Sequence, residues 1–147
     1  MKQSRLFIIT LMCLLMSSAS CFADDIPIPV SQLPGYVTTF VKKYFPNQTI
    51  QAAEKDAEFG GTEYEVYLND GTKVKFDKRS NWKEVDCRAG AVPAAIVPKA
   101  IAAYVKANYP DQEITQIEFD DKKYEVELTN RLELKFDKKG RFIKIDR

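Results

Sequence analysis

Carboxylates are the residues of this chain with the widest scope for chemistry, because its 147 residues include no histidine. The lack of histidine excludes Ser-His-Asp and Cys-His nucleophilic systems, histidine-ligated zinc and imidazole acid–base catalysis. Asp77 and Asp137 recur sixty residues apart, and each directly precedes a turn sequence. We therefore expect their oxygens to accept backbone N–H groups in those turns rather than to form a catalytic pair.

Other reactive residue types give no recognisable site. Asp120-Asp121 and the acidic stretch 54–58 lack the alternating oxygen ligands and the bidentate glutamate of a calcium loop. Gly60-Gly61 is isolated and is not followed by a helix, which a phosphate loop requires. We expect Cys87 to be a small buried side chain rather than a redox centre. The sequence assigns no catalytic residue, metal ligand or cofactor, and it predicts a protein that is not an enzyme.

The first 23 residues have the pattern of an export signal. Basic residues precede an apolar run, 6–16, that is too short to cross a bilayer, and small residues lead to Ala23, where we expect cleavage. The alternative is lipid attachment at Cys21. Ser18 stands where lipoprotein signals usually carry a large aliphatic residue, so the sequence favours soluble export. We expect a periplasmic or secreted protein of a Gram-negative envelope, without a membrane span.

Removal of residues 1–23 leaves 124 residues, with 20 Lys and Arg against 21 Asp and Glu. Balanced and interleaved charge provides no field that would hold nucleic acid or an acidic membrane. This length corresponds to one ordinary domain. A lone cysteine in the mature chain provides no disulfide, so the apolar core must stabilise the fold.

The mature chain contains an internal repeat. Tyr-Glu-Val at 64–66 recurs at 124–126, and Phe-Asp at 76–77 recurs at 136–137. Apolar and polar residues alternate through these segments, as in strands joined by tight turns. Each repeat therefore predicts one helix followed by four short antiparallel strands. The helices recur with an offset of sixty-four, so the first repeat has four extra residues, which we place at 58–62.

Local signals set the expected helix ends and turns. Ser31 can cap the first helix, Pro34 suits its first turn, and Pro46 ends it. Asp70-Gly71 suits a type I′ turn, and 137–140 suits a type I turn. Apolar residues at helical spacing form one stripe: Val37, Phe40, Val41 and Tyr44.

We expect an α+β fold made of two tandem α-β-β-β-β repeats, with an antiparallel sheet and both helices packed on one face. A single domain would span residues 31–147 after an extended lead-in, 24–30. Its first repeat would cover 31–87 and its second 95–147, joined by a linker at 88–94, because sixty residues alone bury only a marginal core. The sequence leaves open whether the strands of the two repeats join or lie side by side.

Strand alternation defines a candidate surface on the face away from the helices. Strict alternation directs Val85, Ile143 and Ile145 inward, and it directs Trp82 and Phe142 outward. Aromatic rings within a polar rim are typical of protein-binding hot spots. The alternative is that these rings cover strand ends or the junction of the repeats. The candidate partner-binding residues are Tyr67, Lys73, Lys75, Trp82, Glu84, Glu127, Phe142 and Lys144.

From about Val30 to Arg147 the double pattern resembles the PepSY-like family of periplasmic proteins, whose fold is similar to that of the β-lactamase inhibitor protein. The features that carry the resemblance are Phe45-Pro46, Tyr109-Pro110, the repeated Tyr-Glu-Val and Phe-Asp, Trp82-Lys83-Glu84-Val85 and Phe142-Ile143-Lys144-Ile145. The resemblance implies an architecture like that of an inhibitor that grips enzymes with the concave face of its sheet. It provides no catalytic residues to transfer.

Three functions are compatible with the sequence. The first is a module that binds an unidentified envelope protein, such as a hydrolase or peptidase, through the outer sheet face. The second is a small-molecule or peptide site at the repeat junction, near Cys87 and the linker. The third is a structural part of the envelope that pairs through an open strand edge.

Overall fold

The computed structural model describes residues 25–58, 60–88 and 90–146. The expected signal peptide 1–23, with cleavage after Ala23 and the alternative lipid site at Cys21, lies outside the described residues. The helical elements are a 3-10 helix η1 (Val30–Gln32), α1 (Gly35–Tyr44) and α2 (Lys99–Asn108). The strands are β1 (Ile26–Pro27), β2 (Ile50–Glu58), β3 (Gly61–Leu68), β4 (Lys73–Phe76), β5 (Trp82–Asp86), β6 (Ile114–Asp120), β7 (Lys123–Leu128), β8 (Glu133–Asp137) and β9 (Phe142–Asp146).

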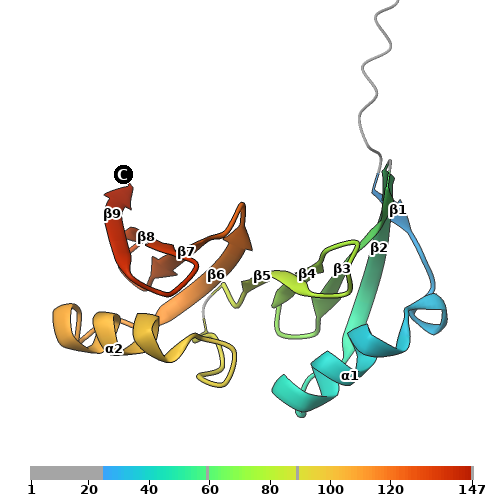
Figure 1. Cartoon of the computed structure of the whole chain (residues 1–147). Helices are drawn as coiled ribbons and strands as arrows, with labels where there is room; N and C mark the ends of the chain where they lie inside the picture. Colours follow the sequence, from blue (N-terminus) through green and yellow to red (C-terminus); the bar gives the residue numbers. More distant parts are fainter. Residues whose placement is uncertain (1–24, 59, 89, 147) are drawn as a thin grey trace, which may run out of the picture.

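These strands form one nine-stranded sheet in sequence order, and every neighbouring pair is antiparallel. The strands of the two repeats therefore join, through the pair β5–β6, which we call the seam. Figure 1 shows both helices on one side of the sheet, while the strands at both ends curve away from the helices. The helix-free face is consequently concave. The predicted α+β fold, with two tandem α-β-β-β-β repeats, is confirmed.

The four extra residues of the first repeat lengthen one hairpin. β2 and β3 contain nine and eight residues, whereas their counterparts β6 and β7 contain seven and six. The insertion thus lies at the end of the β2–β3 hairpin, where the sequence predicted it. β1, which was expected only as an extended lead-in, pairs with β2 through Ile26 and Pro27.

The predicted cap of the first helix is wrong. Ser31 lies in η1, and α1 begins after Pro34, which is extended with φ −59° and ψ 147°. Pro98 precedes α2 with the same geometry. Proline has a fixed φ and no N–H to satisfy, so it starts both helices without a side-chain cap. The predicted stripe is confirmed, with Val37 and Val41 fully buried against the sheet.

The Asp70-Gly71 turn also differs from the prediction. Gly71 has φ +87° and Asp70 does not have a positive φ, whereas a type I′ turn needs positive φ at both central residues. The Gly71 N–H donates to the Leu68 carbonyl, and the Leu68 N–H donates to the Thr72 carbonyl. The hairpin therefore has a three-residue loop with its last residue in the left-handed region. Arg131 takes this conformation at the equivalent position of the second repeat, with φ 68°.

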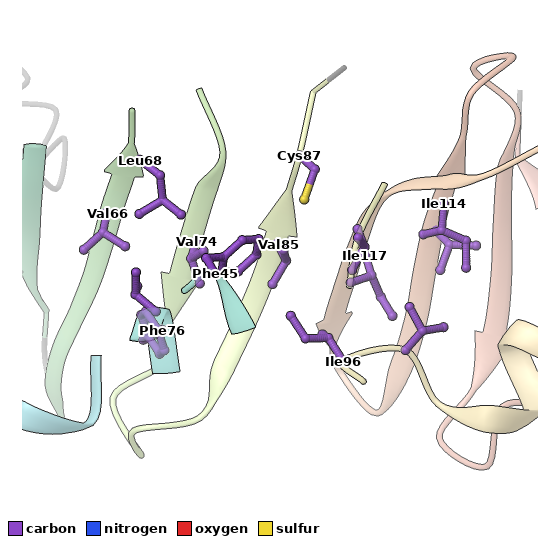
Figure 2. Close-up of a cluster of buried hydrophobic side chains, with 14 of the residues drawn as sticks. Phe45, Val66, Leu68, Val74, Phe76, Val85, Cys87, Ile96, Ile114 and Ile117 are labelled. Carbon is purple, nitrogen blue, oxygen red and sulfur yellow. The ribbon is translucent and has the colours of Figure 1, made fainter. Parts of the chain in front are cut away.

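The core runs through both repeats without interruption. Figure 2 shows Val66, Val74 and Val85 on neighbouring strands, followed across the seam by Ile117. Ile96, from the segment between the repeats, lies beside this junction. Aromatic edge-to-face contacts fix each helix on its own strands, for example Phe40 of α1 against Phe76 at 5.3 Å.

Candidate functional site

Trp82 and Phe142 do not lie on the outer face, and this part of the prediction is wrong. Trp82 pairs with Phe76 and Phe142 pairs with Phe136, in each case next to a β-bulge that inserts one extra residue. A bulge reverses the alternation of faces, so both rings move to the helix side. Phe142 stacks on Tyr104 of α2, with ring centroids 4.7 Å apart and an interplanar angle of 9°.

The other candidate residues do lie on the helix-free face. Tyr67 pairs with Lys73, Lys75 pairs with Glu84, and Lys144 pairs with Lys135, all directed away from the helices. Glu127 lies on the same face of β7. The sheet therefore places the predicted charged residues and Tyr67 on one face, from β3 to β9, but not the two predicted rings.

The strand register creates two acidic rows across the middle of this face. Glu84, Glu118 and Glu125 stand directly opposite one another on β5, β6 and β7. In the next row, Asp86, Gln116 and Glu127 are aligned in the same way. We call these six residues the central acidic rows. They cross the seam, so neither repeat alone contains them.

Lysines flank the central acidic rows on both sides. Lys73 on β4 contacts Glu84 with Nζ and Oε1 2.9 Å apart, and Lys135 on β8 contacts Glu125 at 2.8 Å. Gln116 donates from Nε2 to Glu84 Oε1 at 3.0 Å. The outermost glutamates of one row are thus paired, whereas Glu118 between them makes no ion pair within the described part of the chain.

Glu118 is electrostatically strained by its position. Partial burial raises the pKa of its carboxyl, and the negative charges of Glu84 and Glu125 raise it further. Both neighbours are directly opposite in the sheet, where like charges destabilise the pairing. A positively charged group placed over Glu118 would relieve this repulsion. The middle of the face therefore favours contact with a basic group of a ligand.

Tyr67 is held in place beside the acidic rows by its neighbours. Its hydroxyl donates to Glu65 two residues away on the same face, and Lys75 pairs with the other oxygen of Glu65 at 3.4 Å. The hydrogen bond to Glu65, together with burial, raises the pKa of Tyr67. Tyr67 is therefore a neutral, positioned ring with its edge toward a carboxylate.

A hollow of about 400 Å³ opens at one end of the seam. Asp86, Gln116 and Glu127 of the acidic rows form part of its wall, with Thr115 and Thr129. Arg88 and Arg131 complete it. Arg131 contacts Glu127 at 2.8 Å but leaves most of its side chain in solvent. A smaller hollow of about 120 Å³ adjoins it along Gln116, Glu118 and Glu125.

The helix side of the seam carries a different hollow, of about 330 Å³. Tyr36 and Phe40 of α1 line it from the first repeat, and Phe119 and Tyr124 line it from the second. Trp82 lies between them. The interpretation that Trp82 packs at the junction of the repeats therefore accounts for this ring, and the outer-face interpretation does not.

Sequence reasoning missed Gln116, Glu118 and Glu125 as members of this surface. Each was visible as the polar partner in an alternating strand. Their alignment depends on the β5–β6 register, Val85 opposite Ile117, which no local pattern specifies. If the pairing of β5 with β6 had been known, the central acidic rows could have been predicted from the sequence.

The remaining reactive groups have structural roles. Asp77 accepts the N–H groups of Arg79 and Asn81, and Asp137 accepts those of Lys139 and Arg141, each at 2.9 Å, as predicted. Cys87 is buried, and burial raises the pKa of its thiol to about 11. Across the described ranges no set of three or more acidic or cysteine side chains is arranged to hold a metal ion. None of the helices in those ranges has the length and apolar character to cross a membrane.

Comparisons with known proteins agree with this architecture. A family model described as “Putative beta-lactamase-inhibitor-like, PepSY-like” matches residues 22–60 and 62–144. No curated protein matches the chain significantly.

Three solved structures from Bacteroides species are similar to this chain. One from Bacteroides thetaiotaomicron, described as a “putative calcium-regulated periplasmic protein”, is 48% identical, with 84% of this chain and 98% of that chain covered and a TM-score of 0.78. A periplasmic protein of the DUF2874 family from Bacteroides vulgatus is 44% identical, with the same coverages and TM-score.

A third structure, a periplasmic protein of unknown function from Bacteroides vulgatus, is 33% identical over 84% of this chain and all of that chain, with a TM-score of 0.79. The family match covers most of the sequence, and two of these structures share more than two fifths of their residues with it. The chain belongs to the PepSY-like family.

Proposed function

We propose that this chain is an exported periplasmic module, without enzymatic activity, that binds a protein partner through the concave helix-free face of its sheet. The observation that carries the proposal is the pair of acidic rows at the seam. Three glutamates stand directly opposite one another there, although like charges destabilise such pairs. The free chain retains the repulsion between these glutamates, so a ligand that supplies positive charge would stabilise this surface.

The charge of the face indicates the chemistry of the partner. Basic side chains over Glu118 would compensate its repulsion, and the flanking lysines, Lys73 and Lys135, would accept acidic groups at the rim. Tyr67 supplies an aromatic contact at low entropic cost, because its hydroxyl is already held by Glu65. A protein surface with a basic centre and an acidic rim fits this pattern. The likeness to an inhibitor in the family description supports an enzyme as the partner.

Calcium is not part of the proposal. One relative is described as calcium-regulated, but the described residues of this chain contain no group arranged as a metal site. The periplasmic location is inferred from the descriptions of the three related structures and from the export pattern of residues 1–23.

Charge neutralisation tests the proposal. In the variant Glu118→Gln/Glu127→Gln/Glu133→Gln, all three substitutions lie on the helix-free face around the smaller hollow. The matched control Asp111→Asn/Glu113→Gln/Asp121→Asn removes the same charge from exposed positions outside the hollow. Envelope proteins bound to the immobilised chain are identified by mass spectrometry and their affinities are measured by interferometry.

We expect the face variant to lose its partner, or to bind it at least tenfold more weakly, with the control unchanged. The affinity for the unmodified chain should fall as salt is raised, because the contacts are charged. Equal binding by the face variant and the control would refute the assignment of this face.

A second candidate is supported by the larger hollow at the seam, which lies beside Cys87 and the segment between the repeats. Its acidic and basic walls, with two threonines, suit a short peptide or another small ligand with both charges. Arg131→Gln should then abolish binding of short peptides in a calorimetric titration. The same variant should leave capture of a large protein partner intact if the acidic rows are the site.

A further inference from the structure

The last strand, β9, is an open edge of the sheet with an apolar surface. The other edge is closed by β1, which is only two residues long and contains Pro27, a residue without an N–H for further pairing. β9 has five residues, of which Phe142, Ile143 and Ile145 are large exposed hydrophobics at 37%, 48% and 40% exposure. Ile145 points to the helix side as predicted, but it is exposed, whereas Ile143 is the extra residue of the β8–β9 bulge, so its predicted inward direction is wrong.

The equivalent strand of the first repeat, β5, is covered on this side by a neighbouring strand, β6. Val85 of β5 is the counterpart of Ile145, and it is fully buried, beside Ile117 of β6. Both residues lie on the helix side of the sheet, since Val85 pairs with Val74 and Ile145 pairs with Leu134. The 40% exposure of Ile145 therefore reflects the lack of a neighbouring strand on its open side within the described part of the chain.

The peptide groups that would bind this strand follow from the same comparison. Cys87 donates its backbone N–H to the Thr115 carbonyl at 2.9 Å, so Val85, two residues earlier and opposite Ile117, also directs its peptide groups across the seam. The counterpart of Val85 in β9 is Ile145. An antiparallel strand would find its hydrogen-bonding groups at Ile145.

We propose that β9 pairs with β9 of a second copy of this chain, antiparallel and with the two-fold axis at Ile145. This register places Ile145 opposite its own copy on the helix side. On the helix-free side it places Lys144 opposite Asp146 of the second copy, and Asp146 opposite Lys144. The register centred on Lys144 would instead place two lysines opposite each other, which is unfavourable.

The charges of β9 thus favour self-pairing in one register. Lys135 holds Asp146 with Nζ and Oδ2 2.7 Å apart, which fixes the carboxylate at the edge. A two-fold axis through Ile145 also leaves both sets of helices on one side, so the helix-free faces of the two copies continue into each other. A single strand pair buries less than a standard interface, so we expect a weak dimer.

Sedimentation velocity of the full chain, secreted with its own leader and purified, tests the proposal over a concentration series. We expect the unmodified chain to dimerise with concentration. Lys144→Asp places acids opposite acids, and Asp146→Lys places lysines opposite lysines, so each single variant should dimerise at least tenfold more weakly. An equimolar mixture of the two variants restores opposite charges, and it should form a heterodimer.

Ile145→Lys should also abolish dimerisation, and Ile26→Lys is its matched control. Ile26 is 47% exposed at the opposite edge of the sheet, so its substitution should leave dimerisation unchanged. Circular dichroism verifies that each variant is folded. A chain that stays monomeric throughout, dimers that persist in both single variants, or loss of dimers only in Ile26→Lys would overturn the proposal.

Discussion

Gly140 occupies a turn that has little room for a side chain. It lies in the turn between β8 and β9 with φ +78°, and a Cβ built on it would be 2.9 Å from the Cβ of Ala100 in the first turn of α2. Gly71, in the turn between β3 and β4, has φ +87°, but its nearest neighbour would be Arg88 Cδ at 3.9 Å. The two glycines share the conformational requirement and differ in the available space.

These distances give separate magnitudes for the two alanine substitutions. A residue with a Cβ pays about 1 kcal/mol in the left-handed region, so Gly71→Ala should lower the free energy of unfolding by about that amount. Gly140→Ala pays the same cost and also overpacks α2 against the turn, which adds about 1–3 kcal/mol. We therefore expect a loss of about 2–4 kcal/mol for Gly140→Ala.

Urea unfolding followed by circular dichroism measures both variants. The double variant Gly140→Ala/Ala100→Gly removes the Cβ that causes the close contact. It should recover part of the loss, less the cost of glycine in a helix, up to about 1 kcal/mol. Equal losses for Gly71→Ala and Gly140→Ala would show that α2 moves freely over the turn, and would refute the tight contact between them.

Three further predictions concern the site and its surroundings. Glu118→Gln should stabilise the fold at pH 7 by about 0.5 kcal/mol. The pKa of Glu118 is raised in the folded state, so its ionisation lowers the free energy of unfolding as pH rises through that pKa. The gain from the substitution should therefore vanish in thermal unfolding at pH 4. Trp82→Ala should destabilise the fold by about 2 kcal/mol, because the ring packs against the apolar core where it lines the hollow between α1 and the second repeat, but should leave partner affinity unchanged in a binding titration. Cys87 should react with a thiol reagent at pH 8 at least a hundredfold more slowly in the native chain than in urea, because its pKa is about 11 and its side chain is buried.

Local patterns were sufficient to predict most of the architecture. The spacing of Val37, Phe40, Val41 and Tyr44 identified α1, and the repeated Tyr-Glu-Val and Phe-Asp segments identified hairpins. The four extra residues were correctly placed at the end of the β2–β3 hairpin. Each of these features depends on residues close together in the chain, where periodicity and turn chemistry determine the structure.

The errors arose where one residue changes the register. A single bulge residue, Lys83 in β5, moves Trp82 to the helix side, and Ile143 does the same for Phe142. Strict alternation contains no signal for a bulge, so both rings were assigned to the wrong face. Strand order across the seam is likewise non-local, which is why the alignment of Glu84, Glu118 and Glu125 appeared only in the folded chain.

Site-specific photo-crosslinking in the periplasm tests the central claim, that the helix-free face binds the partner, most directly. The photoreactive residue p-benzoylphenylalanine replaces Glu133, an exposed residue on the rim of that face, or Ala103, an exposed residue of α2 on the opposite side. The account predicts a discrete protein adduct from position 133 and none from position 103. An adduct from position 103 alone would place the binding surface on the helices and contradict the account.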